Sequence, residues 1–366
     1  MPLRHRRAIA AAAAAGALLA AAVADVLASG DPTTSAVGAR AGHDAQAALG
    51  RRPVPLPRFI YAPYFETWHT ESLPSVAQKS GARYLTLAFL QTTKKGSCTL
   101  AWNGKQLVQP GGRYSTQIAE LRHAGGDVIP SFGGFGADHD DTEIADSCTS
   151  VAKIASAYEN VVTTYGVTRL DMDIEDKSLT RKAGIARRSA AIALLQKWAA
   201  RTHRRVQVAF TLSVEPGGLS DSGLAVLKSA ISHGVRVDAV NIMAFDYYNA
   251  KTDSDMGSEA IEALTSTHRQ LMRLFPHVPA QRLWYLEGIT LMPGIDDFPG
   301  KTEVTYLSEV QALLSYVQRH PIQAFSIWSV QRDNGGCPGA GSSGTCSGIT
   351  QPRWAFSHLL DSYSRS

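Results

Sequence analysis

The feature that most restricts the fold of this 366-residue chain is a regular alternation, from residue 59 onward, of short apolar segments with amphipathic helical stretches. Such an alternation is typical of βα units arranged around a parallel sheet. Each apolar segment begins roughly 25 to 45 residues after the previous one. Eight segments qualify as strands: residues 59–64, 83–90, 127–132, 169–175, 206–214, 239–246, 283–290 and 323–329.

The stretches between these strands carry helical patterns, among them residues 114–123, 185–203, 223–233, 258–274 and 306–319. Eight βα units close as a (β/α)₈ TIM barrel, which usually needs about 250 residues. An open doubly wound sheet is the alternative, but it more often has about six strands, and no G-x-G-x-x-G motif follows the first predicted strand. We therefore expect an α/β protein with a single TIM-barrel catalytic domain.

The N-terminal end has the layout of a secretory signal peptide. Three arginines within residues 4–7 precede an Ala/Leu-rich run over residues 8–24, and small-x-small cleavage sites follow near residues 24 and 28. An uncleaved anchor helix is the alternative, because the run approaches transmembrane length. We expect a signal peptide over residues 1–28, a flexible linker over 29–57 and the catalytic domain over 58–366. The mature protein should be secreted, extracellular and without stable membrane association.

The charge balance argues against nucleic acid as a partner. The formal net charge is +4, and the first 28 residues hold three of the 36 Lys and Arg and one of the 32 Asp and Glu. Removing them leaves 33 minus 31, or +2, with no basic stripe. We expect a monomer.

The four cysteines of the exported chain are expected to form disulfides. Cys337 and Cys346 lie nine residues apart in a Gly/Ser/Pro-rich loop, so we pair them with each other. Cys98 then pairs with Cys148. The other two possible connectivities remain open at the level of sequence. No C-x-x-C pair is present, which disfavours a zinc site.

The strongest chemical signal is the segment R-L-D-M-D-I-E at residues 169–175. Alternate residues of a strand point to one face, so Asp171, Asp173 and Glu175 project together. Three carboxyl groups crowded inside a barrel repel one another and lose solvation, which raises their pKa values. A carboxylic acid is kept protonated for donation to a leaving group in this way. Glu175 stands last, at the strand end where barrel active sites lie. A solvated or metal-binding acidic cluster is the alternative reading.

This acidic row resembles the D-x-x-D-x-D-x-E signature on the fourth barrel strand of glycoside hydrolase family 18, the chitinase family. Asp171, Asp173 and Glu175 match its last three acids, whereas Thr168 stands in place of the first. Residues 131–134 (S-F-G-G) resemble the third-strand motif S-x-G-G of the family. That resemblance implies that Ser131 helps to hold the inner aspartates, and we expect it among the residues that contact substrate.

The sixth predicted strand resembles the M-x-x-D-Y segment of the family. The resemblance implies that Met243 and Asp246 line the substrate subsite and that Tyr247 holds the acetamido oxygen of the sugar. Many members have a tyrosine where this chain has Phe245. For Tyr248 we expect a place in the core.

Aromatic residues at the ends of the eighth and first strands complete the resemblance. Trp328 matches the family's terminal-strand tryptophan, which forms the floor under the sugar at the cleavage point. Glu66 and Trp68, after the first strand, are expected substrate contacts. Trp102 could stack on more distant sugars or anchor a loop.

The resemblance implies a retaining, substrate-assisted chitinase that needs no metal or other cofactor. The 2-acetamido oxygen of the substrate attacks the anomeric carbon, Glu175 acts as acid and then base, and Asp173 supports the developing cation. The expected substrates are chitin and other β-1,4-linked N-acetylglucosamine oligomers, cleaved internally. The alternatives are a non-catalytic chitin-binding lectin on the same barrel and an endo-β-N-acetylglucosaminidase that acts on glycoprotein glycans.

Overall fold

A computed structural model describes residues 53, 56–248, 255–297, 303–340 and 343–365. All of them belong to one compact unit that spans Ala45–Ser366. The predicted signal peptide, and the predicted linker apart from residues 53, 56 and 57, lie outside the described residues. Within the described part of the chain, no helix has both the length and the apolar character needed to cross a bilayer.

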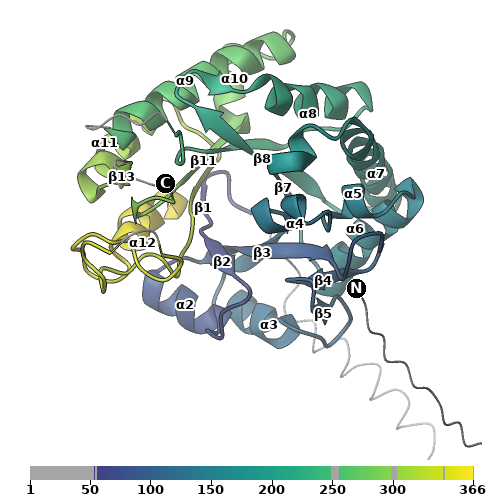
Figure 1. Cartoon of the computed structure of the whole chain (residues 1–366), viewed down its shortest axis with the longest axis horizontal. Coiled ribbons are helices and arrows are strands. Elements are labelled where there is room, and N and C mark those ends of the chain that lie inside the picture. The colour runs from purple at the N-terminus through teal and green to yellow at the C-terminus, as the bar shows by residue number, and fades with distance from the viewer. Residues whose placement is uncertain (1–52, 54–55, 249–254, 298–302, 341–342, 366) are drawn as a thin grey trace, which may run out of the picture. The chain divides into compact units, whose positions relative to one another are not determined.

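The central element is a closed parallel barrel, as predicted. Neighbouring strands follow the order β1, β14, β11, β10, β8, β7, β6, β3, and β2 pairs with β3, which brings the first strand segment back to the third (Figure 1). The barrel strands are β1 (Ile60–Tyr61), β2 (Tyr64–Glu66), β3 (Tyr84–Thr92), β6 (Asp127–Gly133), β7 (Arg169–Ile174), β8 (Gln207–Glu215), β10 (Ala239–Met243), β11 (Glu287–Leu291) and β14 (Ala324–Ile327). The eight-unit TIM barrel is confirmed.

The first barrel strand, predicted as one continuous element, is split in two around Pro63. β1 pairs with β14 on one side and β2 pairs with β3 on the other. Proline has no N–H group to donate to a sheet ladder, so it marks a break in regular pairing. The neighbouring groups still bind across the break, since Ala62 N–H donates to Phe325 O at 2.9 Å and Thr86 N–H to Pro63 O at 2.9 Å.

Helices surround the barrel in the alternating order that the sequence indicates (Figure 1). They are α2 (Leu73–Ser80), α3 (Ser115–His123), α4 (Phe135–His139), α5 (Ile144–Ser147), α6 (Val151–Tyr165), α7 (Lys182–Arg201), α8 (Asp221–Ser232), α9 (Met256–Leu274), α10 (Ala280–Leu283), α11 (Leu307–Val317) and α12 (Ala355–Leu360). The five predicted helices correspond to α3, α7, α8, α9 and α11 within a few residues.

The start of the seventh predicted strand was wrong. Residues 280–286 form α10 and the 3₁₀ turn η2 (Trp284–Leu286), and β11 begins only at Glu287. Trp284 stacks on His268 of α9 with ring centroids 3.8 Å apart. An apolar run can serve a buried helical turn as well as a strand, so the pattern alone did not distinguish them.

The core lies between the barrel and its helices. The side chains of Leu170, Met172 and Ile174, which alternate with the acids of β7, are 0 to 1% exposed. They share one hydrophobic cluster with residues of α6, including Ile154 and Val161. Apolar side chains therefore face outward from β7 into the core, and the polar row of this strand faces the barrel interior.

Both predicted disulfides are confirmed. Cys98 bonds Cys148, and this bridge ties the segment before the hairpin of β4 (Leu100–Trp102) and β5 (Gln106–Leu107) to the end of α5. Cys337 bonds Cys346 across the Gly/Ser-rich loop. Trp102 is fully buried and its indole N–H donates to the Tyr165 hydroxyl at 2.7 Å, so it anchors the hairpin.

The two bridges should differ in their effect on stability. Replacing Cys98 and Cys148 together by Ser should lower the free energy of unfolding by about 4 kcal/mol, because that bridge closes a 50-residue loop. Replacing Cys337 and Cys346 should cost about 2.5 kcal/mol, because their loop spans nine residues. Urea unfolding of the two double variants against the wild type measures both values. A larger loss from the shorter loop would contradict the loop-entropy explanation.

Candidate active site

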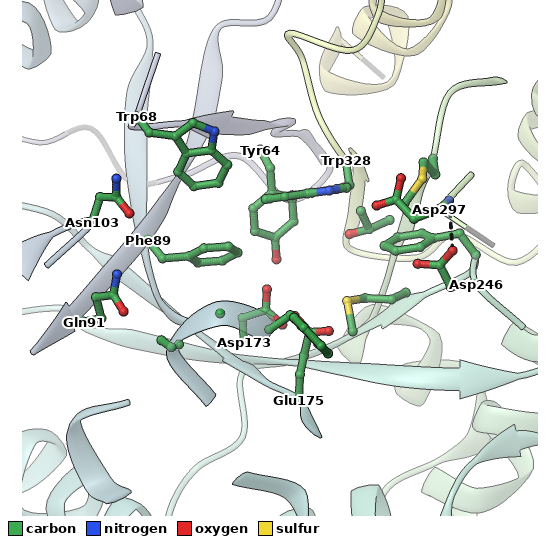
Figure 2. A pocket seen from close by; sticks show the side chains of 18 of the residues that line it. Tyr64, Trp68, Phe89, Gln91, Asn103, Asp173, Glu175, Asp246, Asp297 and Trp328 are labelled. Atoms are coloured by element: carbon green, nitrogen blue, oxygen red, sulfur yellow. Dashed lines mark hydrogen bonds between the residues drawn. The ribbon is translucent and has the colours of Figure 1, made fainter. Parts of the chain in front are cut away.

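A cavity of about 530 Å³ opens at the C-terminal ends of the barrel strands. Its volume is in the range of small-molecule binding sites. Figure 2 shows Trp68, Gln91 and Asn103 at one end, Asp246 and Asp297 at the other, and the acids Asp173 and Glu175 between them.

Asp171 lies beneath this cavity rather than in its wall. Its carboxylate accepts hydrogen bonds from Tyr64 Oη at 2.9 Å, Ser131 Oγ at 2.7 Å and Thr211 Oγ1 at 2.7 Å. Burial raises its pKa, and the three hydroxyl donors partly offset that rise. Ser131 therefore holds an inner aspartate, as the resemblance implied. Ser131 is fully buried and does not line the cavity, so its prediction as a substrate contact is not supported.

Asp173 reaches the cavity floor. Burial raises its pKa well above the usual range, and the neighbouring carboxyl groups of Glu175, Asp171 and Asp138 raise it further. Its buried Oδ1 atom has no hydrogen-bond partner among the described residues. An unpaired buried oxygen is costly in the free protein and is available to a donor on a bound molecule.

Glu175 stands one residue beyond the end of β7, with its side chain half-buried in the cavity wall. Burial raises the pKa of its carboxyl group to about 7, and the charges of Asp246 and Asp176 contribute in the same direction. A main-chain hydrogen bond from Phe135 opposes the rise. The result is a carboxyl group whose proton is exchangeable near neutral pH, as general acid–base chemistry requires.

Aromatic rings form one side of the cavity. Trp328 stacks on Phe89 with ring centroids 5.5 Å apart and planes 19° apart, and it contacts the edge of Tyr64 at 5.6 Å. Trp68 extends this group, 6.1 Å from Trp328 and 44% exposed. The predicted positions of Trp328 and Trp68 at the cavity are thus met (Figure 2). Sugar rings have an apolar C–H face that stacks on such surfaces.

Glu66, predicted to contact substrate, does not line the cavity. It is 3% exposed and lies 2.6 Å from the His69 ring nitrogen, while its main-chain N–H donates to Gln331 at 3.1 Å. Burial raises its pKa, and His69 opposes that rise. Glu66 therefore helps to hold the loops around the cavity in place through His69 and Gln331.

The backbone after β10 decides where the two neighbouring tyrosines lie. Met243 and Asp246 line the cavity as predicted, but β10 ends at Met243, and Asp246 adopts a left-handed backbone with φ of 51°. This turn breaks the strand alternation. Tyr247 is 5% exposed, lies near Glu259 and Glu303 and lines a smaller adjoining hollow that Glu175 also lines, and its contact with the acetamido oxygen stays a prediction. Tyr248, expected in the core, is 64% exposed and lines the cavity.

Asp246 faces the acid row from the other end of the cavity. Its Oδ1 atom accepts the main-chain N–H of Asp297 at 3.1 Å (Figure 2). Burial raises its pKa to about 7, with contributions from Asp297 and Glu303. The carboxyl group of Asp246 is therefore only partly ionised near neutral pH.

Several cavity residues escaped sequence reasoning: Phe89, Gln91, Asn103, Phe135 and Asp297. Phe135 is 61% exposed directly after the S-F-G-G motif, and its position there was the available signal. Asn103 occupies the left-handed position (φ 48°) of an Asn-Gly turn between β4 and β5. That dipeptide is a strong hairpin signal. Which way the hairpin points depends on tertiary packing.

Among the described residues, no group of three His, Cys, Asp or Glu side chains could hold a metal ion.

Comparison with known proteins identifies the family. The family model for glycosyl hydrolases family 18 matches residues 60–273. The chain belongs to this family. It is 31% identical over 322 residues to the probable bifunctional chitinase/lysozyme of Escherichia coli K12, covering 84% of this chain and 35% of that protein. It is 32% identical over 288 residues to endochitinase 11 of Metarhizium anisopliae, covering 76% and 53%. This family 18 chain thus spans about a third to a half of these curated relatives.

Solved structures of family 18 agree with the fold. The catalytic domain of a hyperthermophilic chitinase from Pyrococcus furiosus matches with a TM-score of 0.73 and 30% identity, over 86% of this chain and 98% of that one. Catalytic-site mutants of active domain 2 of the thermostable chitinase from the same organism, complexed with chito-oligosaccharides, match with a TM-score of 0.74 and 29% identity, over the same shares.

The raised pKa of Glu175 predicts a pH-dependent effect of Glu175→Gln on stability. The ordinary pKa of 4.5 rises to about 7 on folding, so the proton on Glu175 stabilises the folded state below pH 4.5, and this contribution is lost as the pH rises through 7. The variant cannot ionise. Its free energy of unfolding, relative to wild type, should therefore increase by about 3 kcal/mol between pH 4.5 and pH 8. Urea unfolding at both pH values measures this. Glu120→Gln, on the exposed face of α3, is the control and should show no such change.

Proposed function

We propose that the protein is a chitinase that hydrolyses β-1,4 linkages between N-acetylglucosamine units. The observation that carries the proposal is the position of Glu175, with a pKa near 7, in an aromatic-lined cavity of a family 18 barrel. The chitinase names of two relatives and the chito-oligosaccharides bound to a similar catalytic domain support the choice of substrate. The lectin alternative is disfavoured by the presence of this acid in the cavity.

In the proposed mechanism, Glu175 protonates the glycosidic oxygen of a sugar that stacks on Trp328. The acetamido oxygen of that sugar attacks the anomeric carbon as the bond from this carbon to the protonated glycosidic oxygen breaks. The leaving sugar departs and an oxazolinium ion remains. Asp173, through its unpartnered Oδ1, accepts the acetamido N–H and stabilises the positive charge. Glu175 then activates water, and the anomeric configuration is retained. An intramolecular nucleophile can contribute about 7 to 11 kcal/mol in ideal geometry.

Substrate assistance is favoured by the arrangement of the other carboxyl groups. Asp171 is enclosed by three hydroxyl donors below the cavity, and Asp173 lies on the same strand as Glu175. Asp246 faces the acid row from the far end of the cavity, and with a pKa of about 7 it is only partly ionised near neutral pH. An ordinary retaining glycosidase needs an ionised second carboxylate as nucleophile.

We further propose that residues 1–28 direct export, that residues 29–57 act as a linker and that the enzyme works outside the cell. The two disulfides support this location, because such bridges persist in oxidising compartments.

The first functional test uses Glu175→Gln. The wild type should cleave N-acetylglucosamine oligomers, and its kcat/KM should fall as the pH rises through about 7, because Glu175 of the free enzyme must be protonated to act as the acid. The variant should lose about 10²–10⁴-fold in kcat while still binding oligomers. Chromatography of the products gives the rate and the cleavage pattern, and Glu120→Gln serves as the control. Retention of more than about a tenth of wild-type turnover would remove Glu175 from the acid role.

The second test separates substrate assistance from a protein nucleophile. Fully deacetylated oligomers should resist cleavage, since an amine cannot close the oxazolinium ring. A thiazoline analogue of the cyclised intermediate should inhibit competitively, and Asp173→Asn should weaken both inhibition and activity. Mass spectrometry after labelling with a fluorosugar probe checks for a covalent sugar ester. A trapped ester on Asp246, or rapid cleavage of the deacetylated oligomer, would contradict the mechanism.

A further inference from the structure

A buried cluster of charged side chains, unused by the mechanism above, lies where α4 and α5 pack against η1 (Asp176–Leu179) and α7. It consists of Asp138, Glu143, Asp146 and Arg188. Asp138 is 0% exposed, and Glu143 and Arg188 are each 2% exposed. Charged groups removed from water are stable only when they are paired and hydrogen-bonded.

Asp138 contacts the main chain of Glu175 directly. Its Oδ2 atom accepts the Glu175 N–H at 2.5 Å. β7 ends at Ile174, so this N–H lies beyond the regular strand, and the carboxylate of Asp138 takes the place of a neighbouring strand. Phe135, in the same short helix, donates its main-chain N–H to the Glu175 carboxylate. The helix α4 therefore holds Glu175 at both its main chain and its side chain.

Arg188 supplies the positive charge behind Asp138. Its Nη2 atom lies 2.8 Å from Glu143 Oε2, and the same oxygen caps α5 by accepting the N–H groups of Ala145 at 2.8 Å and Asp146 at 3.1 Å. Burial raises the pKa of Asp138 and the charge of Glu143 adds to the rise, whereas Arg188 opposes it. Arg188 thus ties α7 to the N-terminus of α5 through Glu143, and its positive charge acts on Asp138 through space.

The packing around Asp138 leaves little freedom. Gly133 has a left-handed backbone with φ of 94°, and a Cβ atom there would lie 2.1 Å from the carbonyl oxygen of Asp173 and 3.2 Å from Asp138 Oδ1. Only glycine lets the chain after β6 come this close to β7. The resulting contact sets α4 directly against the end of the acid row.

We propose that Asp138, with Arg188 behind it, is a positioning residue for Glu175: it fixes the main chain at the end of β7 so that the carboxyl group points into the cavity. The inference rests on the proposed hydrolytic function. It assigns to Asp138 a role in the rate of the chemical step and none in substrate binding. A misplacement of about 1 Å at a reacting group can lower a rate about 10²-fold.

The test compares Asp138→Ala with Asp127→Ala. Asp127 is a matched control: it is 2% exposed and pairs with the buried Arg122 at 2.8 Å, but it lies at the N-terminal end of β6, away from the cavity. At a temperature where both variants are folded by circular dichroism, Asp138→Ala should lower kcat on N-acetylglucosamine oligomers by about 10²-fold, with KM within about threefold of wild type. Asp127→Ala should lower the melting temperature but leave kcat within about threefold.

A conservative variant separates positioning from stability. Asp138→Asn keeps a carbonyl oxygen that can accept the Glu175 N–H. Its kcat should therefore be at least about tenfold higher than that of Asp138→Ala. Equal losses of kcat in Asp138→Ala and Asp127→Ala, or a loss in Asp138→Ala that appears only in KM, would overturn the proposal.

If Asp138→Ala does not fold, Arg188→Lys tests the same connection. Lysine keeps the charge but lacks the planar fork of donors, and we expect about a tenfold lower kcat with unchanged KM. An unchanged kcat would overturn the proposal. An inactive wild type would instead refute the chitinase function itself, so the two failures are distinguishable.

Discussion

Hydrogen bonds that converge on Asp171 hold the interior of the barrel together. Tyr64 of β2, Ser131 of β6 and Thr211 of β8 all donate to its carboxylate from separate strands. Asn241 of β10 continues the polar layer, donating to Thr211 at 3.1 Å and to Thr290 of β11 at 2.8 Å. A buried carboxylate is costly unless its oxygens accept hydrogen bonds. The strands must therefore stay in the register that keeps these donors in place.

The polar layer around Asp171 affects the protonation of the carboxyl groups above it. Asp171 consumes the available hydroxyl donors, so Asp173 and Glu175 are buried with fewer of them. Burial and the charges of neighbouring carboxyl groups raise the pKa values of both, and few hydrogen-bond donors offset that rise. Hydrogen bonding therefore distinguishes the enclosed Asp171 from the two carboxyl groups that reach the cavity. Poorly satisfied groups lower stability, and such departures from good packing are expected at functional sites.

The walls of the cavity are formed largely by the loops that follow the barrel strands. The Asn103 turn is held by buried Trp102 and by the Cys98–Cys148 bridge, and Phe135 lies on a helix whose Asp138 grips the end of β7. A rigid scaffold with functional loops at its C-terminal face is the general plan of this fold. Here side-chain anchors, rather than long regular elements, fix the position of those loops.

The sequence by itself determined the alternation of strands and helices, the closed barrel and the row formed by Asp171, Asp173 and Glu175. Periodicity is local: a strand repeats every two residues and a helix every 3.6, so neighbouring letters carry the signal. The family motifs were also within reach, because each depends on residue types at short spacings. The nine-residue spacing favoured the Cys337–Cys346 pair, and Cys98–Cys148 followed as the remaining pair, while the other connectivities stayed open until the structure showed both bridges.

Only the tertiary structure decided where the chain departs from regular geometry. The left-handed turn at Asp246 sends Tyr247 inward and Tyr248 into the cavity, and Glu66 turns to His69 instead of to the cavity. Asp138 meets Glu175 across 37 residues of sequence. These outcomes follow from contacts between distant segments and from competition for buried hydrogen-bond donors. Neither can be predicted from the local amino-acid pattern.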